Sequence, residues 1–368
     1  MFDIFLNIFL HTSKFKRKMK KVISLLFITL LVMSAFSQIK YPKVPKSTND
    51  ATIKGKLVYP YHFKYEGNPL SRMHSAADPS VQVWDGVVWV ITSQDRNMDS
   101  TKHSSHYAAM DGYHAFSSSD MINWTDHGEI FHSSDLNHSL WGPTPDNYMW
   151  APSAARKKDK NGVWTYYLYY PHNAKFGGER WVTGVATAPT PIGPYTDQGP
   201  LKAGTMSMDP MVFIDDDGEA YVYSNGMIVA KLKPDMVSLA ETPRKIEYAP
   251  DSILKEPTLR FCEGLYMHKK DGIYYLSYSN FKNKEYQGFY AMGKNPYGPF
   301  EWKGAMAPAP QGAQDHHSII EFKGQWYYFY HIALKDLPKY KESQGRIVCF
   351  DKLFYNEDGT IQMIKHTR

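Results

Sequence analysis

The chain has 368 residues, of which 42 are Lys or Arg and 37 are Asp or Glu, so its formal net charge is +5. This mild charge, with no polybasic block beyond the N-terminus, argues against nucleic acid binding. The length suits one large all-β domain or two smaller domains. Aromatic residues make up 15% of the sequence. Such a surplus is typical of proteins that stack sugar rings and equally of aromatic-rich propeller strands, so composition leaves both interpretations open.

The N-terminal part has the pattern of a secretory signal. Met19 is followed by two lysines, an apolar run extends from Val22 to Met33, and small residues precede Gln38. The apolar run is shorter than a membrane-spanning helix requires. We therefore expect residues 1–37 to be an upstream extension plus a signal peptide, with Met19 as the true start. The mature protein is then periplasmic or secreted, with no membrane insertion after cleavage.

The rest of the chain indicates one domain after a short lead-in. Residues 38–65 are polar and interrupted by prolines, which predicts an N-terminal segment lying on the domain surface. Residues 66–368 show short strands separated by turn signals such as Asp85-Gly86 and Asp271-Gly272. No stretch of twelve or more residues has a helical apolar period, so helix content should be low. No linker rich in Pro, Gly or Ser divides this part.

Five stretches begin alike: a short polar or acidic motif opens a strand, and a Gly-containing turn leads into an aromatic-rich strand. Their openings lie about 50 to 75 residues apart, in the range typical of solenoids and propellers. We therefore predict an all-β, five-bladed β-propeller with about four strands in each blade. A β-sandwich does not explain the regular repeat. The openings are Ala77-Asp78-Pro79, Trp150-Ala151-Pro152, Met208-Asp209-Pro210, Cys262-Glu263-Gly264 and Asp315-His316-His317-Ser318.

Asp78, Asp209 and Glu263 stand in three of these openings. The innermost strand of each propeller blade lines the central channel, so the three carboxylates should converge there. Hydrolysis of a glycosidic bond needs two carboxyl groups, one on each side of the bond. A third carboxylate nearby raises the pKa of the acid, because like charges resist joint ionisation. An isolated Asp-Pro is a common turn dipeptide, but matched placement in separate repeats favours a site.

Two further features of the first blade bear on substrate access. The segment from Met98 to Tyr113 is a long insertion, and long structureless loops in compact domains are usually functional. We expect it to border the pocket, and Asp95, at the end of the preceding strand, to face substrate at the same border. A deep pocket closed by such a loop favours exo-cleavage of one terminal sugar, whereas an endo-arabinanase needs an open groove.

The two cysteines are Cys262 and Cys349. Export permits a disulfide between them, but the sequence does not show whether their side chains meet. Two buried thiols fit the sequence at least as well. Neither cysteine has a C-x-x-C partner, which argues against a metal site built on them.

Six motifs, in chain order, resemble those of glycoside hydrolase family 43. This family consists of five-bladed propellers that act on arabinose- and xylose-containing polysaccharides by an inverting mechanism. The resemblance covers roughly residues 70–362, and no single motif carries it alone. The motifs are Ala77-Asp78-Pro79-Ser80, Trp150-Ala151-Pro152, Met208-Asp209-Pro210 with the run 213–218, Cys262-Glu263-Gly264, His316-His317-Ser318 and Gly345-Arg346.

The resemblance implies a role for each matched residue. Asp78 is the general base, Glu263 the general acid, and Asp209 the residue that raises the pKa of Glu263 and orients substrate. Trp150, Arg346 and His316 are implied to contact the sugar. In relatives the matching histidine lies near a hydrated calcium ion on the propeller axis. Calcium prefers oxygen ligands, so contact with His316 is expected through water, and no organic cofactor is implied.

The expected activity is therefore that of an exo-acting, inverting glycoside hydrolase. It would release terminal α-L-arabinofuranose or β-D-xylose from oligosaccharides derived from plant polysaccharides. The alternatives within the family are an endo-arabinanase and a β-galactosidase-type enzyme. A non-catalytic carbohydrate-binding propeller is the alternative of another class, but it does not require three placed acids.

Overall fold

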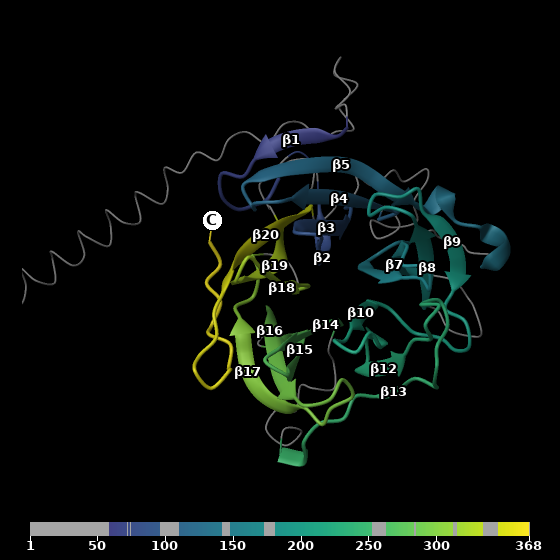
Figure 1. The fold of residues 1–368 in the computed structure, drawn as a ribbon. Helices are drawn as coiled ribbons and strands as arrows, with labels where there is room; N and C mark the ends of the chain where they lie inside the picture. Colours follow the sequence, from purple (N-terminus) through teal and green to yellow (C-terminus); the bar gives the residue numbers. More distant parts are fainter. Residues whose placement is uncertain are drawn as a thin grey trace, which may run out of the picture. The chain divides into compact units, whose positions relative to one another are not determined.

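The computed structural model describes residues 59–71, 73, 75–95, 110–141, 148–172, 181–251, 263–282, 285–311, 315–333 and 345–367. All of them belong to one compact unit that spans Lys46–Arg368. Within it, antiparallel sheets are arranged around a central axis (Figure 1). Helical structure in the described residues is short, as in the 3-10 helices η3 (Ser133–Asp135) and η4 (His138–Leu140). None of the described helices is long and apolar enough to cross a membrane.

Each sheet forms one blade, and the blades follow one another along the chain. Blades 2, 3 and 4 have four strands each, in simple up-and-down order. Blade 1 consists of β1 (Tyr61–Lys64), β2 (Ala77–Trp84), β3 (Val87–Ser93), β4 (Gly112–Ser118) and β5 (Asn123–His132). Blade 2 consists of β6 (Ser153–Lys158), β7 (Trp164–His172), β8 (Val182–Ala188) and β9 (Thr196–Pro200), and blade 3 of β10 (Met211–Ile214), β11 (Ala220–Ser224), β12 (Ile228–Lys231) and β13 (Arg244–Lys245). Blade 4 consists of β14 (Glu263–Lys270), β15 (Ile273–Lys282), β16 (Glu285–Gly293) and β17 (Glu301–Ala307), and blade 5 of β18 (Ser318–Phe322), β19 (Gln325–Ala333) and β20 (Arg346–Leu353). The predicted all-β, five-bladed propeller is confirmed.

In blades 2 to 5 the first strand is the innermost one, and in blade 1 the innermost strand is β2. β2, β6, β10, β14 and β18 contact one another in a closed ring around the axis. Serines on three of these strands join neighbouring blades. Ser80, Ser153 and Ser318 each accept a hydrogen bond through Oγ from a backbone N–H of the next inner strand, at 2.8, 2.9 and 3.2 Å. The openings recognised in the sequence are therefore the starts of the channel-lining strands.

Two blades depart from the expected four strands. β1 lies inside the segment expected to be a lead-in, residues 38–65, and pairs with β5 as a fifth strand of blade 1. Blade 5 has three strands in the part of the chain that the structure describes. The backbone before β2 lies against β20, where Leu70 N–H donates to Val348 O at 2.7 Å and Ala76 N–H to Arg346 O at 2.9 Å. The start of blade 1 thus closes the ring on blade 5.

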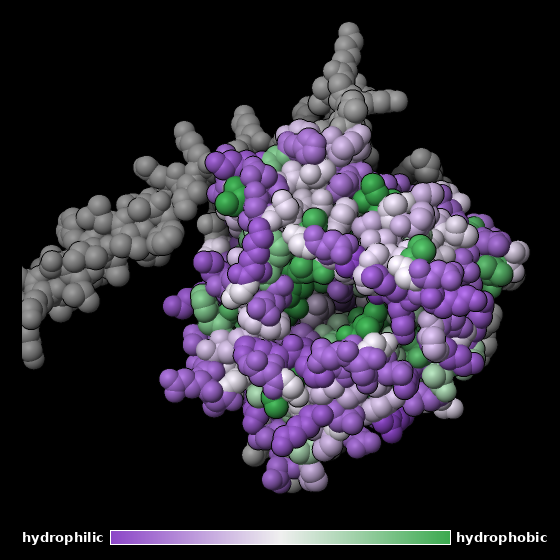
Figure 2. Space-filling view, viewed as in Figure 1, coloured by the Kyte–Doolittle hydropathy of each residue, from purple (hydrophilic) through white to green (hydrophobic). Residues whose placement is uncertain are grey.

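Much of the aromatic surplus fills the spaces within and between blades. Trp124, Trp141 and several tyrosines on strands β4, β7, β11, β15 and β19 are almost completely buried. On the face shown in Figure 2 the surface is hollowed at the centre of the ring, with hydrophobic residues at the walls and a mostly hydrophilic surround. Many aromatic residues of the described strands are thus explained by the core.

Candidate active site

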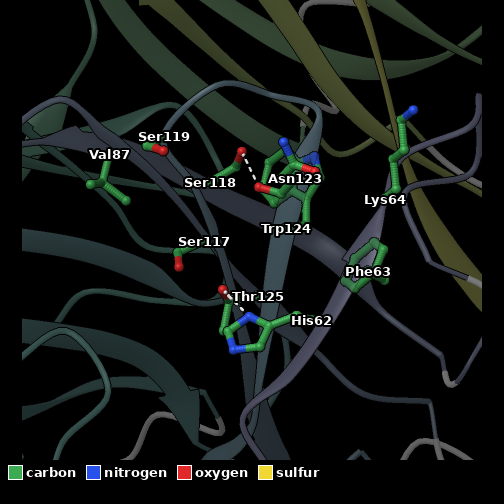
Figure 3. Close-up of a pocket in the computed structure, with 10 residues that line it drawn as sticks. All are labelled: His62, Phe63, Lys64, Val87, Ser117, Ser118, Ser119, Asn123, Trp124 and Thr125. Carbon is green, nitrogen blue, oxygen red and sulfur yellow. Dashed lines mark hydrogen bonds between the residues drawn. The ribbon is translucent and has the colours of Figure 1, made fainter.

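Two hollows in the described structure differ in chemistry. The first lies on blade 1, where β1 and β5 meet, and has a volume of about 630 Å³. Figure 3 shows its ten residues, among which His62 contacts Thr125 and Ser118 contacts Asn123; none of the ten carries a carboxylate. The second, with a volume of about 200 Å³, is the axial pocket, lined by Asp78, Met110, Trp150, Ala151, Met208, Asp209, Glu263, Tyr286, His316 and Arg346. Only the axial pocket brings carboxylates together.

A local irregularity of the inner strands directs the acids into this pocket. The pairing of β2 with β3 shifts register between Ala77 and Ser80, and that of β14 with β15 shifts between Glu263 and Tyr266. Such bulges bend a strand and redirect a side chain. Asp78 and Asp209 both have left-handed backbone conformations, with φ of 48° and 53°. Asp adopts this region more readily than most non-glycine residues, so the Asp-Pro openings suit the bend.

Asp78 is a buried carboxylate held on both oxygens. Arg346 Nη1 donates to Oδ1 at 2.8 Å, and Ser93 Oγ donates to Oδ2 at 2.6 Å. The backbone N–H of Asp78 donates to His331 Nδ1 at 3.0 Å. Burial raises the pKa of Asp78, but the charge of Arg346, followed by His331, His316 and the Ser93 hydrogen bond, lowers it more. The pKa therefore lies well below its ordinary value, and Asp78 is an anion at neutral pH.

Glu263 has the opposite electrostatic environment. Burial is the main cause that raises its pKa, and the charges of Asp209 and Asp78 raise it further, to about 7. A hydrogen bond from Tyr286 and the charge of Arg346 act in the lowering direction. Glu263 is therefore protonated in a substantial fraction of molecules at neutral pH. A proton donor and a stable anion lie in the same pocket, which is the arrangement that acid–base catalysis needs.

Asp209 is the third acid of the axial pocket. Its Oδ2 accepts a hydrogen bond from Asn225 Nδ2 at 2.8 Å, and the residue is 8% exposed. Burial raises its pKa most; His316 lowers it, Asp78 raises it, and the net direction is upward. The expected convergence of Asp78, Asp209 and Glu263 on one pocket is thus what the structure shows, while their catalytic roles remain predictions.

Arg346 lies in the pocket wall, but Asp95 does not lie where the sequence led us to expect. Arg346 bridges Asp78 on one side and Asp95 on the other, with Nη2 donating to Asp95 Oδ1 at 2.8 Å. Asp95 is 6% exposed and is absent from the residues that line the pocket. It lies behind Arg346 because its carboxylate is taken up by the guanidinium, so a position facing substrate at the pocket border is not observed.

Trp150 and His316 both line the pocket. The Trp150 ring lies 4.2 Å from that of Trp181, and both contact Tyr148, so Trp150 belongs to a group of three packed rings. His316 Nδ1 lies 3.6 Å from Asp78 Oδ1. Most of the Met98–Tyr113 insertion and Cys262 lie outside the described residues, whereas Cys349 is buried.

The sequence did not predict Ser93 and His331 beside Asp78, Asn225 beside Asp209, or Tyr286 in the pocket wall. Met110, also in the wall, belongs to the Met98–Tyr113 insertion that was expected to border the pocket. Ser93 ends a strand and His331 lies two residues before the end of an aromatic-rich one, but neither position indicates a partner. They are recognised only once the blades are placed around the axis.

Direct coordination of calcium beside His316 is not supported by the donors described there. Among the residues that the structure describes, no group of three or more His, Cys, Asp or Glu side chains could hold a metal ion. Asp78, the carboxylate beside His316, accepts hydrogen bonds from Arg346 and Ser93. Because calcium needs six to eight oxygen ligands, waters included, these residues do not fit an ion held by the protein alone, and the expected contact through water stays a prediction.

Comparison with known proteins gives a consistent result. The family described as glycosyl hydrolases family 43 matches residues 67–361. An arabinoxylan arabinofuranohydrolase of Paenibacillus polymyxa is 33% identical over 336 residues, which cover 81% of this chain and 51% of that protein. Xylosidase/arabinosidase 43A of Humicola insolens is 34% identical over 339 residues, which cover 80% and 98%. The chain thus spans about half the length of the first relative and nearly all of the second.

Solved structures show the same fold. One is a GH43 β-xylosidase/α-arabinofuranosidase from a compost microbial metagenome, in complex with xylotriose and in a calcium-free form. It is 30% identical, superimposes with a TM-score of 0.67, and the match covers 83% of this chain and 98% of that one. The propeller described here is therefore an architecture shared with enzymes that act on glycosides.

Proposed function

Because the chain belongs to glycosyl hydrolase family 43, we propose that it is an exo-acting, inverting hydrolase that releases terminal α-L-arabinofuranose or β-D-xylose. Its substrates are oligosaccharides derived from plant polysaccharides. The observation that carries the proposal is the separation of two carboxyl pKa values in one pocket. Asp78 is held as an anion by Arg346, whereas Glu263 has a pKa of about 7.

The two carboxyl groups divide the reaction between them. Asp78 accepts a proton from a water molecule as that water attacks the anomeric carbon, on the face opposite the leaving group. Glu263 donates its proton to the glycosidic oxygen as the bond to the anomeric carbon breaks. Asp78 ends the cycle protonated and Glu263 ionised, and exchange with solvent restores both.

The size of the pocket supports cleavage at a chain end. Its volume of about 200 Å³ is below the range of about 300 to 1,000 Å³ usual for drug-sized ligands. Such a pocket suits one terminal sugar ring better than a run of rings. The relatives with the names arabinofuranohydrolase and xylosidase/arabinosidase support the two candidate sugars.

The proposal is tested with the protein from Gln38 onward on aryl α-L-arabinofuranoside, β-D-xyloside and β-D-galactoside. Release from one of the first two should fall by about 100-fold or more in Asp78→Asn and in Glu263→Gln. Asp85→Asn, in an exposed turn, is the control that should keep full activity. NMR of the first product should show the inverted anomer.

Several outcomes would contradict the proposal. Near-wild-type rates in either variant, with intact folding, would remove that residue from the chemistry. Retention of the anomeric configuration would exclude the water-mediated step. Internal cleavage of linear arabinan without release of single sugars would identify an endo-acting enzyme, and sugar binding without any release would indicate a binding propeller.

We also propose that the protein is exported. The support is the run of residues 19–38, in which two lysines, an apolar stretch and small residues follow in the order of a secretory signal. N-terminal sequencing of the protein recovered from the cell envelope or medium should begin at Gln38. An N-terminus at Met19 in the recovered protein would contradict this proposal.

A further inference from the structure

The carboxylate of the buried residue Asp95 is bound by Arg346. Its Oδ2 accepts hydrogen bonds from the backbone N–H of Arg346 at 2.8 Å and from Nε at 3.0 Å. Its Oδ1 accepts from Nη2 at 2.8 Å. The carbonyl oxygen of Asp95 also accepts a hydrogen bond from Ser75 Oγ. The side chain and the backbone of Asp95 are therefore both fixed, and Asp95 is not among the residues that line the axial pocket.

The fixed guanidinium transmits this constraint to Asp78. A guanidinium is planar, and its donors form a rigid fork. Once Asp95 holds Nε and Nη2, the direction of Nη1 follows, and Nη1 donates to Asp78 Oδ1 at 2.8 Å. Arg346 is 4% exposed, so little solvent competes for its donors. We propose that Asp95 is a positioning residue that, through Arg346, holds the Asp78 carboxylate in the orientation that takes the proton from the attacking water.

The end of β3 contributes a second support to the same carboxylate. Ser93 donates to Asp78 Oδ2 at 2.6 Å, two residues before Asp95. The two oxygens of Asp78 thus have one fixed donor each, and each carboxylate oxygen can accept about two hydrogen bonds. One acceptor position on each oxygen is left for water. A rotation of Arg346 would change which position faces the pocket, so the orientation of Asp78 depends on the hold of Asp95.

This inference rests on the proposed function, because it assigns Asp95 to the step in which Asp78 acts as base. It replaces the expectation that Asp95 binds the sugar. The two roles predict different kinetics. A residue that binds substrate equally in the ground and transition states changes KM, whereas one that orients the base changes kcat.

The experiment compares wild type, Asp95→Asn and Asp95→Glu on the aryl glycoside that the wild type cleaves. In Asp95→Asn the side-chain amide presents its own N–H groups to the guanidinium, so Arg346 loses its fixed orientation. We expect kcat to fall by about 100-fold, the scale of a misplacement of about 1 Å, with KM within about twofold of wild type. Asp95→Glu keeps the charge and should be intermediate in kcat.

The matched control is Asp85→Asn. Asp85 also pairs with an arginine, Arg156, but in an exposed turn between β2 and β3. Its kcat and KM should equal those of the wild type. Thermal unfolding and circular dichroism are recorded for every variant, so that a loss of folded protein is separated from a loss of turnover. An inactive wild type would contradict the proposed function and not the role of Asp95.

A double variant tests whether Asp95 acts through Arg346. If it does, Asp95→Asn should cause no further fall in kcat when Arg346→Lys is already present. Additive losses would overturn the proposal, because they would show an effect independent of Arg346. A rise in KM with unchanged kcat would also overturn it, since Asp95 would then contact the sugar. If Asp95→Asn does not fold, Asp95→Glu takes its place. A wild-type kcat with a raised KM in Asp95→Glu would then overturn the proposal.

Discussion

At the scale of single residues, the pKa of Glu263 makes the pH dependence testable. A general acid must be protonated in the free enzyme, so kcat/KM should fall as pH rises through about 7. The charge of Asp209 is, after burial, the next cause that raises this pKa. Asp209→Asn should therefore move the basic limb to lower pH. Profiles of kcat/KM from about pH 4 to 9 provide the test.

Asp85→Asn removes an acid at an exposed turn and should leave the basic limb at its wild-type pH. Asp78 has a pKa well below its ordinary value, so it stays ionised over this range and the acidic side of the profile should be flat. A basic limb that does not move in Asp209→Asn would show that Asp209 does not act on Glu263.

Single residues also show which parts of the site a sequence motif can predict. Asp78, Asp209 and Glu263 could be predicted to meet because each opens a repeat, and repeats place equivalent positions around one axis. Asp95 and His331 could not be placed, because their partners Arg346 and Asp78 lie 251 and 253 residues away in the chain. Neither contact follows from a local pattern. It follows only from the closure of blade 5 on blade 1.

At the scale of strands, the inner ring depends on serines that lie in the motifs or directly after them, and whose hydrogen-bond partners the sequence does not indicate. Ser153 Oγ accepts a hydrogen bond from Val212 N–H, which joins β6 to β10. Both residues are buried. Ser153→Ala leaves the Val212 N–H without this acceptor, and we expect the free energy of unfolding to fall by about 1 to 3 kcal/mol.

Urea unfolding measures this loss. Ser119→Ala, at an exposed position after β4, is the control and should change the free energy of unfolding by less than about 0.5 kcal/mol. Equal stability of the two variants would show that the serine bonds do not hold the blades together.

The strands and turns themselves were predictable, because alternating aromatic and β-branched residues flank each Gly-containing turn. Partners between blades were not, since they depend on how neighbouring sheets pack.

At the scale of the whole propeller unit, the ring is joined twice at the seam between blades 5 and 1. Within the pocket, Arg346 of β20 binds Asp78 of β2. Further out, the Asn68 side chain pairs with the backbone of Phe350 as a neighbouring strand would. Its Nδ2 donates to Phe350 O at 3.0 Å, and its Oδ1 accepts from Phe350 N–H at 2.9 Å. The segment around Asn68 lies in the range 66–368 assigned to the propeller, whereas β1 lies in the expected lead-in and pairs with β5 of blade 1. Asp78, the proposed base, therefore lies where blade 5 closes on blade 1.

Asn68→Ala should weaken that seam. Phe350 would lose both side-chain partners, and each buried backbone group left unpaired costs about 1 to 3 kcal/mol. Because blade 1 and blade 5 share the seam, we expect one cooperative urea transition at a lower midpoint with an unchanged m-value. Ser119→Ala, at an exposed position after β4, is again the control and should keep the wild-type midpoint. A second transition in Asn68→Ala would contradict this picture, because it would show that blade 5 can separate while the other blades stay folded.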